Sequence, residues 1–265
     1  MHLGHALSAV LSHDFARSRG GRFLLRIEDI DAGRAREEFV TGIEKDLRWL
    51  GLAWDGPVVR QSQRLPLYAD ALERLKTMEL VYPCFCTRAD IARSTSAPHG
   101  PDGPIYPGTC RTLAAADLTR PHAWRLDMAK AVAAAGRLTW RDHGREIVAR
   151  PDLLGDVVLA RKDAPVSYHL AVTVDDADQG VTHVIRGRDL YLSTHVHRLL
   201  QALLGLPTPE YRHHPLLIGP DGERLAKRHG ALSLAELRAD GADPAMIVGA
   251  FRAGAAPLGF RLSDD

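Results

Sequence analysis

The 265-residue sequence lacks the features that mark several whole classes of protein. It has no long apolar run and no signal peptide, so nothing in it predicts a membrane span or secretion. Cysteine is scarce, and its 3 copies are an odd number, which argues against a disulfide framework and for a reducing compartment. There is no internal repeat and no low-complexity tract beyond short alanine runs. These absences favour a globular cytoplasmic protein without a membrane partner.

Net charge is also nearly absent. The chain carries 34 Lys and Arg against 33 Asp and Glu, which gives a formal net charge of +1. Proteins that bind nucleic acid mainly by electrostatic attraction usually carry a clear excess of positive charge. The arginine-rich stretch from 137 to 150 could form a local basic patch, but an ordinary solvated surface explains it equally well. The composition therefore argues only against a strongly electrostatic binder.

The N-terminus carries the tetrapeptide His2-Leu3-Gly4-His5, followed by apolar residues at near-helical spacing up to residue 15. This spacing predicts a helix that starts at the tetrapeptide. Gly4 has no side chain, so a ligand can approach the backbone closely, and the flanking imidazoles can donate hydrogen bonds to phosphate oxygens. A helix N-terminus also favours anions through its N–H groups. The alternative is a pair of ordinary histidines near a chain end.

A second candidate for phosphate chemistry lies near the other end of the sequence. Residues 216–218 are typical of a short strand, and Gly219-Pro220-Asp221-Gly222 is typical of a turn. The stretch from Glu223 to His229 is polar and cationic, and it contains Arg224 and Lys227. Such a loop can close on a polyphosphate and stabilise charge that develops in a transition state. A solvated basic surface loop is the alternative.

Apolar segments between these ends are predicted to be strands, over residues 22–29, 168–176 and 183–189. The first places Glu28 at the carboxyl end of a strand, where open α/β sheets bind ligands. A carboxylate there can hold the ammonium group of an amino acid. The third strand carries Arg186, whose guanidinium can hold a carboxylate with two parallel bonds. A structural ion pair is the alternative for both residues.

Two further segments have apolar residues at helical spacing and are predicted to be core-facing helices. Their apolar stripes are Phe39, Ile43, Leu47 and Leu50 in the first, and Leu65, Tyr68, Leu72 and Leu75 in the second. Strand–helix alternation through residue 80 implies a parallel sheet, which the segment from 84 to about 165 interrupts. Short strands are expected around Trp124 and Trp140, and a short C-terminal helix is expected to be capped by Ser233.

The cysteines all lie in one stretch, at positions 84, 86 and 110. The spacing Cys84-x-Cys86 puts both thiols on one face of an extended segment. In a reducing compartment, clustered thiols are more often metal ligands than disulfides. A structural Zn²⁺ site needs four ligands, so one is missing, and His99 is the chemically usual partner. Buried, inert cysteines are the alternative.

Three of these stretches, taken in order, resemble the nucleotide-binding signatures of class I aminoacyl-tRNA synthetases of the glutamate type: His2-Leu3-Gly4-His5, Arg26-Ile27-Glu28-Asp29 and Arg224-Leu225-Ala226-Lys227-Arg228. The first resembles the HIGH motif of that family and the third its KMSKS loop. Residues 221–231 resemble the loop of glutamyl synthetases along their whole length. Two positions depart from the pattern, because Arg224 stands in place of the first lysine and Ala226 in place of the usual serine. The charge at 224 is kept, whereas Ala226 lacks the hydroxyl for one hydrogen bond.

The resemblance implies an α/β fold, with a Rossmann-like class I synthetase catalytic core and an inserted zinc-binding α+β subdomain. It implies the first half of the core at 1–83, an RNA-contacting insertion with the zinc site at 84–165, the second half at 166–212, and the KMSKS-like loop with C-terminal helices at 213–265. The implied site residues are His2, His5 and Lys227 for catalysis, His2, Gly4, His5, Arg224 and Lys227 for ATP, Glu28, Tyr168 and Arg186 for glutamate, and Cys84, Cys86, Tyr106 and Cys110 for one structural zinc ion. Magnesium is expected to accompany ATP.

Length separates close relatives within this family. A full glutamyl-tRNA synthetase has an additional anticodon-binding region, and the 265 residues leave no room for one. The layout resembles the short branch of the family, which is a stand-alone catalytic core. This implies a monomer that activates L-glutamate with ATP and transfers it to queuosine in the anticodon stem-loop of tRNA(Asp). A truncated glutamyl-tRNA synthetase core, another ATP-using nucleotidyltransferase and a degenerate RNA-binding module are the alternatives.

One departure from the family pattern concerns the N-terminus. The family has a strand and a turn before the HIGH motif, with an arginine that helps to bind glutamate, whereas this sequence begins at Met1-His2. We therefore expect either a late start or a truncation, and weak activity of the chain as it stands.

Overall fold

The computed structural model describes residues 1–30, 36–93, 99–100, 103–113, 116–219 and 233–263. The chain forms two compact units. Unit 1 comprises Met1–Gln61, Val184–Leu190 and Tyr211–Asp265, and unit 2 comprises Ser62–His183 and Tyr191–Glu210. Each unit thus combines segments that are distant in the sequence. This division follows spatial contacts, and the functional boundaries expected at 83, 165 and 212 stay predictions.

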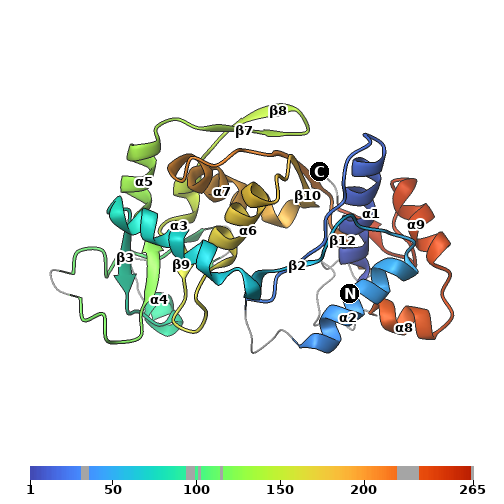
Figure 1. The fold of residues 1–265 in the computed structure, drawn as a ribbon, viewed down its shortest axis with the longest axis horizontal. Coiled ribbons are helices and arrows are strands. Elements are labelled where there is room, and N and C mark those ends of the chain that lie inside the picture. The colour runs from blue at the N-terminus through green and yellow to red at the C-terminus, as the bar shows by residue number, and fades with distance from the viewer. Residues whose placement is uncertain (31–35, 94–98, 101–102, 114–115, 220–232, 264–265) are drawn as a thin grey trace. The chain divides into compact units, whose positions relative to one another are not determined.

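Unit 1 is built on helices that share one apolar core (Figure 1). They are α1 (Leu3–Arg17), α2 (Glu37–Trp49), α8 (Leu234–Ala239) and α9 (Pro244–Arg252). Buried Leu7 and Val10 of α1 share this core with Ile247 and Phe251 of α9. The predicted N-terminal helix is confirmed, and it begins directly after His2, which is its N-cap.

The strands of unit 1 are short. β1 (Arg26–Ile27) pairs in parallel with β2 (Val59–Arg60), and β12 (Leu217–Ile218) pairs antiparallel with β13 (Arg261–Leu262). β10 (His183–Gly187) lies beside β11 (Glu210–His214), and the 3-10 turn η3 (Arg188–Leu190) follows β10. The strands predicted at 183–189 and 216–218 are therefore confirmed in their main part.

The strand predicted over 22–29 is confirmed only at Arg26–Ile27. Before it, Phe23 bonds to a single residue, because its N–H donates to the Asp55 carboxylate at 2.8 Å and its carbonyl accepts the N–H of Asp55 at 2.7 Å. The position expected for Glu28 is nevertheless right, since it directly follows β1 at the carboxyl end of a parallel pair.

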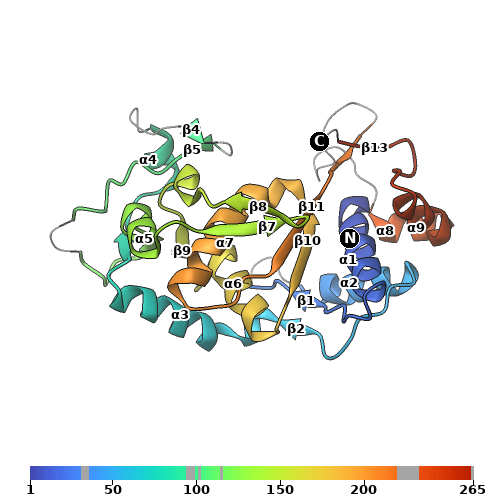
Figure 2. The same ribbon diagram turned by 90° about the horizontal axis from the view of Figure 1, so that it is seen from above.

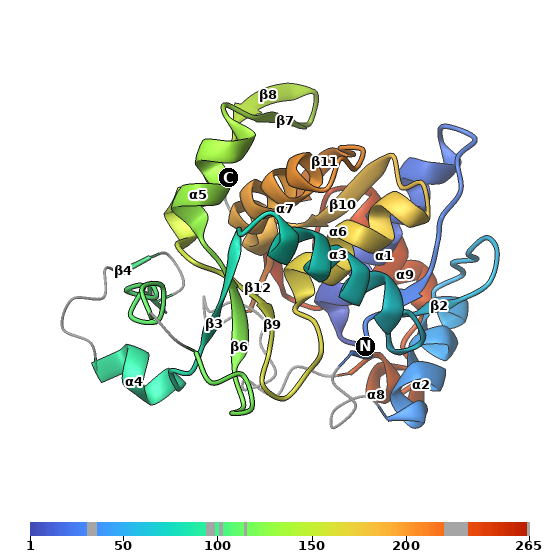
Figure 3. The ribbon, with the colours of Figure 1, turned by 60° about the vertical axis from the view of Figure 1, so that its left-hand side comes forward.

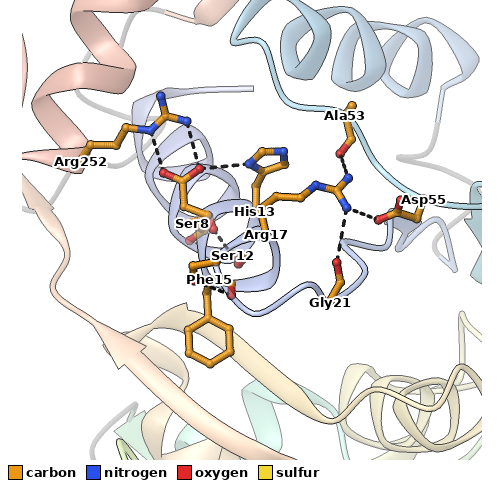
Figure 4. A network of polar contacts seen from close by, with 11 residues as sticks. Ser8, Ser12, His13, Phe15, Arg17, Gly21, Ala53, Asp55 and Arg252 are labelled. Carbon is orange, nitrogen blue, oxygen red and sulfur yellow. Dashed lines mark hydrogen bonds and ion pairs between the residues drawn. The ribbon is translucent and has the colours of Figure 1, made fainter.

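Ion pairs hold the C-terminal half of α1 (Figure 4). Arg17 donates to the Asp55 carboxylate and to the Ala53 carbonyl, each at 2.8 Å. Arg252 of α9 donates to both carboxylate oxygens of Asp14, from Nε at 2.7 Å and from Nη2 at 3.0 Å. Hydrogen bonding to Arg252 lowers the pKa of Asp14. These contacts fix α1 against residues 53–55 and α9, and so fix the direction in which its N-terminus points.

Unit 2 contains an antiparallel sheet in the order β3–β6–β9, which Figure 3 shows, and Figure 2 shows β9 with the helices of this unit. The strands are β3 (Val81–Cys84), β6 (Ala123–Leu126) and β9 (Val158–Ala160). The helices are α3 (Leu65–Thr77), α4 (Arg88–Arg93), α5 (Met128–Ala135), α6 (Tyr168–Asp178) and α7 (Tyr191–Leu203). Smaller elements are the pair β4 (His99–Gly100) and β5 (Gly103–Pro104), the hairpin β7 (Thr139–Asp142) and β8 (Arg145–Val148), and the 3-10 turns η1 (Gln61–Gln63) and η2 (Pro151–Leu154).

The strand predicted over 168–176 is wrong, because this segment is helix α6. The run is apolar and rich in β-branched residues, and a short buried helix cannot be told from a buried strand by such a pattern. Tertiary contacts decide for the helix. Nε of Arg64 donates to Asp175 at 2.7 Å, and its Nη2 donates to Asp178 at 2.5 Å. Residues three apart share a face on a helix but would point to opposite faces of a strand.

The predicted helical stripes are confirmed as helices α2 and α3. Their first residues do not face the core, however, since Phe39 is 56% exposed and Leu65 is 36% exposed. Both stand in the first turn of their helix, and in α2 the next residue, Val40, is buried instead. The cap at Ser233 is confirmed, because its hydroxyl oxygen accepts the N–H of Glu236 at 3.1 Å. Strands β6 and β7 confirm the predictions around Trp124 and Trp140.

Among the described residues, no helix is both long and apolar enough to cross a membrane.

Candidate active site and metal centre

The start of α1 arranges two imidazole rings around one turn of backbone. Nδ1 of His2 accepts the N–H of Gly4 at 3.1 Å, and Nδ1 of His5 accepts the N–H of His2 at 3.3 Å. The ring centres lie 3.7 Å apart. Because Nδ1 is the acceptor in both neutral rings, the ring proton lies on Nε2. The motif therefore presents two Nε2–H donors at a helix N-terminus, an arrangement suited to an anion.

A residue larger than glycine would not fit at position 4 without moving a neighbouring side chain. A Cβ added to it would lie 3.0 Å from Cε1 and 3.2 Å from Nδ1 of His2. A side chain at position 4 would therefore push the His2 ring away from its bond to the backbone. The sequence-based reason for Gly4 was close approach of a ligand, and the structure adds this second, internal reason.

Arg186 lies on β10 and is largely buried, with 9% of the residue exposed. Its Nε donates to Nε2 of His213 at 3.3 Å, and its Nη2 donates to the carbonyl of Leu190 at 3.2 Å. Its guanidinium carbon lies 5.2 Å from the ring centre of Tyr211. Tyr211 and His213 are two residues apart on β11, so they share one face of that strand. β11 thus orients the arginine that was predicted to bind a carboxylate.

His214 points to the opposite face of β11 and contacts α1. Its Nδ1 donates to the carbonyl of Pro215 at 2.8 Å, which leaves Nε2 to accept the hydroxyl of Ser8 at 2.7 Å. Burial lowers the pKa of His214, which favours this neutral form. Sequence reasoning left His213 and His214 without a role. Period-2 alternation within a strand is the signal that could have separated them.

The structure describes some of the remaining residues predicted for the active site and leaves others outside the described part. Glu28 is exposed at the end of β1. Tyr168 is the first residue of α6, in unit 2. Arg224 and Lys227 lie outside the described residues. The roles of all these residues in ATP or glutamate binding stay predictions.

The cysteines form a compact cluster in unit 2. The sulfur atoms of Cys84, Cys86 and Cys110 all lie within 4.8 Å of one another, and Cys86 and Cys110 approach to 3.5 Å. The hydroxyl oxygen of Tyr106 lies 3.6 Å from the Cys86 sulfur and accepts the N–H of Cys110 at 2.8 Å. The structure therefore brings together all four residues predicted to bind the metal.

The donor set and its spacing fit a zinc ion. With Zn–S bonds of about 2.3 Å, sulfur atoms at the corners of a tetrahedron lie about 3.7 Å apart. The separation of 3.5 Å between the Cys86 and Cys110 sulfur atoms is close to this distance, and no separation in the cluster exceeds 4.8 Å. Burial raises the pKa of the Cys86 thiol to about 11. Burial acts in the same direction on the Cys110 thiol, but hydrogen bonds from Tyr106 and from the Phe85 backbone outweigh it and lower that pKa to about 7. A thiolate is the form that binds a metal. The fallback ligand His99 lies on β4, and the placement of its side chain is outside the described part.

Comparisons with known proteins identify the family of the chain. The chain matches the family described as "tRNA synthetases class I (E and Q), catalytic domain" over residues 1–260. It is 51% identical to a glutamyl-Q tRNA(Asp) synthetase of Rhodobacter capsulatus, over 93% of this chain and 94% of that protein. A glutamyl-Q tRNA(Asp) synthetase of Symbiobacterium thermophilum is 46% identical, over 94% of this chain and 81% of that protein.

Solved structures show the same likeness at lower identity. A glutamate-tRNA synthetase from Elizabethkingia anophelis has a TM-score of 0.69 to this chain at 27% identity, and the match covers 87% of this chain. The chain spans 50% of the length of that protein. A glutamate tRNA ligase from Elizabethkingia meningosepticum, solved in complex with its amino acid, gives the same TM-score of 0.69.

Proposed function

The chain belongs to the class I tRNA synthetases (E and Q), with the α/β fold of their catalytic domain, and we propose that it activates L-glutamate with ATP and transfers it to queuosine in the anticodon of tRNA(Asp). The observation that carries this proposal is the 51% identity to a glutamyl-Q tRNA(Asp) synthetase across 93% of the chain. We expect a monomer that works in the cytoplasm, where its RNA substrate is found.

The start of α1 supports the activation step. The Nε2–H groups of His2 and His5 stand at a helix N-terminus, beside Gly4, whose lack of a side chain leaves room for the His2 ring. Arg224 and Lys227 supply positive charge from the KMSKS-like loop, and Mg²⁺ accompanies ATP. In this assignment the protein lowers the barrier chiefly by stabilising charge on the phosphates as the adenylate forms.

Glutamate offers one ammonium group and two carboxylates, and the proposal assigns a charged side chain to two of these groups. Glu28 holds the ammonium group, Arg186 holds a carboxylate, and Tyr168 faces the substrate. Arg186 is supported by the contacts that orient it, with His213 and the Leu190 carbonyl taking two of its donors. Arg186→Ala should mainly raise the glutamate concentration needed for half-maximal ATP–pyrophosphate exchange. Arg188→Ala, on the exposed turn after β10, is the matched control.

The RNA substrate is tested by transfer of labelled glutamate. Activation should proceed without tRNA, and label should appear on tRNA(Asp) that contains queuosine but not on the same tRNA without it. The linkage should survive removal of the 3′-terminal nucleotide, because the acceptor is a base in the anticodon and not the terminal ribose.

Three results would reject this assignment. Equal labelling of tRNA(Asp) with and without queuosine would show that queuosine is not the acceptor. Labelling of the 3′ end of tRNA(Glu) would favour a glutamyl-tRNA synthetase core, the function named for the solved relatives. Absence of glutamate-dependent exchange, with RNA binding retained, would favour a degenerate RNA-binding module.

We also propose that Cys84, Cys86, Tyr106 and Cys110 hold one structural zinc ion, since their donor atoms lie at distances that suit a tetrahedral site. Metal analysis of the purified chain should find one zinc per molecule, and Cys84→Ser should remove it. Tyr106→Phe should weaken zinc retention, whereas His99→Ala should not. Loss of zinc from the His99→Ala variant, with zinc retained by Tyr106→Phe, would identify His99 as the fourth ligand.

A further inference from the structure

A buried carboxylate lies behind the cysteine cluster. Asp156, which precedes β9, is 2% exposed. Its Oδ2 accepts the Tyr82 hydroxyl and two donors of Arg111, Nε at 3.0 Å and Nη2 at 2.5 Å. Its Oδ1 accepts the N–H of Met128 at 3.0 Å. A buried charge needs such partners, because a lone carboxylate loses its hydration when it is buried and nothing replaces it.

Two of the residues that bond to Asp156 stand within two positions of a cysteine of the cluster. Tyr82 stands two residues before Cys84 on β3, so both side chains lie on the same face of the strand. Arg111 is the residue after Cys110. The single side chain of Asp156 therefore holds the two separate segments that supply Cys84 and Cys110.

The main chain of Asp156 is connected through Arg125 to Tyr106, the tyrosine in the cluster. Its carbonyl accepts Nη1 of Arg125 at 2.7 Å. The guanidinium carbon of Arg125 lies 3.9 Å from the ring centre of Tyr106, within the range of a cation–π contact. The Tyr106 oxygen in turn accepts the N–H of Cys110. Arg125 thus fixes the orientation of the ring whose oxygen faces the sulfur atoms.

The other end of β9 reaches the remaining cysteine. Nζ of Lys162 donates to the carbonyl of Phe85 at 2.6 Å and to that of Cys86 at 3.2 Å. Residues on both sides of β9 therefore contact every segment that contributes a cysteine. Asp156 is the buried member of this arrangement, and Lys162 is the exposed one.

We propose that Asp156 is a positioning residue for the metal site, which it holds in ligand geometry through Arg111, Tyr82 and Arg125. The inference rests on the proposed zinc site, and it adds a second layer of residues that the sequence motifs do not reveal. Such outer partners typically change metal affinity by about 10- to 100-fold when they are removed.

The test is competition for zinc between the full-length, zinc-loaded chain and a chromophoric chelator. Asp156→Asn keeps the shape of the side chain but loses its charge, and should weaken zinc binding at least about tenfold. Asp152→Asn is the matched control, because Asp152 lies in the same segment but pairs with Arg150 at the surface. This control should keep the affinity of the wild-type chain.

A second set of variants tests the path through the ring. Arg125→Gln should weaken zinc binding about tenfold in the wild-type background. In the Tyr106→Phe background it should have little further effect, because the oxygen that it positions is already absent. Full additivity of the two changes would show that Arg125 acts on the fold and not on Tyr106.

The outcomes separate this inference from the metal site itself. A wild-type chain that binds no zinc rejects both. A wild-type chain that binds zinc, together with a folded Asp156→Asn variant of equal affinity, rejects the role of Asp156 alone. If Asp156→Asn does not fold, Arg111→Gln provides the same comparison, since it removes one partner and leaves the Tyr82 and Met128 contacts in place.

Discussion

The start of α1 and the cysteine cluster are held together over very different sequence distances. His2 and His5, at the start of α1, each accept a backbone N–H that is two or three residues away. In the cluster, Asp156 bonds to Tyr82 across 74 positions, and Lys162 bonds to Phe85 across 77. The orientation of the two rings is therefore local, although the backbone beneath them also bonds to a distant residue, because the Met1 carbonyl accepts the N–H of Leu234 at 2.8 Å. The cysteine cluster as a whole exists only when distant segments have come together.

This difference predicts how the two sites respond to change. A group at the end of a helix that is fixed elsewhere, as α1 is by Asp14 and Arg17, can be altered with little effect on folding. A cluster that joins several segments contributes to the stability of all of them. Variants in the nucleotide-binding motifs should therefore change rates, and variants around the cysteines should change stability and metal content.

The largest effect is expected at Lys227, although this residue lies outside the described part of the chain. Lys227→Ala should slow glutamate-dependent ATP–pyrophosphate exchange by about 10²-fold or more, the scale for loss of one group that stabilises developing charge. The thermal midpoint should stay within experimental error of the wild-type value. A normal exchange rate would mean that this loop is an ordinary basic surface. A large fall in the thermal midpoint would mean that the loop, like the cysteine cluster, contributes to stability.

Cys84→Ser should show the opposite pattern. Loss of a ligand to a structural zinc ion removes binding energy from the folded state only, so the free energy of unfolding should fall by roughly 2–3 kcal/mol in the presence of excess zinc. Exchange measured well below the thermal midpoint should fall by less than about tenfold, which is about 1.4 kcal/mol in the activation barrier. Denaturant titrations with and without zinc measure the first quantity. Equal stability in both conditions would mean that the cluster is not a metal site.

Gly4→Ala tests the local character of the α1 motif. The new Cβ would approach the His2 ring to 3.0 Å, so the ring should move and exchange should slow by roughly tenfold. Gly42→Ala in α2 is the matched control, since a Cβ there meets nothing within 4 Å. The control should be neutral or slightly stabilising, because alanine favours a helix. Equal rates for both variants would show that the His2 position does not matter for activation.

The smallest expected effect concerns His195 of α7. Its Nδ1 accepts Nε1–H of Trp140 at 3.1 Å and the N–H of Arg150 at 3.2 Å, so the neutral ring is required. Burial lowers its pKa below the ordinary value of 6.5, with Arg150 acting in the same direction and Asp152 opposing. Below about pH 6.5 the unfolded chain therefore binds a proton that the folded chain does not, and stability falls as the pH falls.

His195→Gln should remove this part of the pH dependence. The difference in unfolding free energy between pH 7 and pH 5.5 should shrink by about 1 kcal/mol relative to the wild-type chain. His143→Asn, on the exposed turn between β7 and β8, should leave the difference unchanged. A pH profile that is the same in all three proteins would contradict the role of His195.

Much of unit 1 could be predicted because its signals are local. The helix start at His2, the place of Glu28 after β1 and the cap at Ser233 depend on residues within a few positions of one another. α6 could not be predicted in the same way, since its apolar run suits a strand equally well. Arg64, more than a hundred positions away, bonds to Asp175 and Asp178 on one face of that segment and so requires a helix.

The sequence by itself determined the family, the helix that carries the first motif and the identity of the clustered side chains proposed to bind a metal. These follow from residue type and short spacing, which the backbone turns directly into shared faces of a helix or strand. Only the tertiary structure decided that His213 lies against Arg186, and that Asp156 stands behind Cys84 and Cys110. Contacts of this kind depend on which distant segments meet, and burial then selects the partners, because a buried charge or donor must be matched wherever the chain places it.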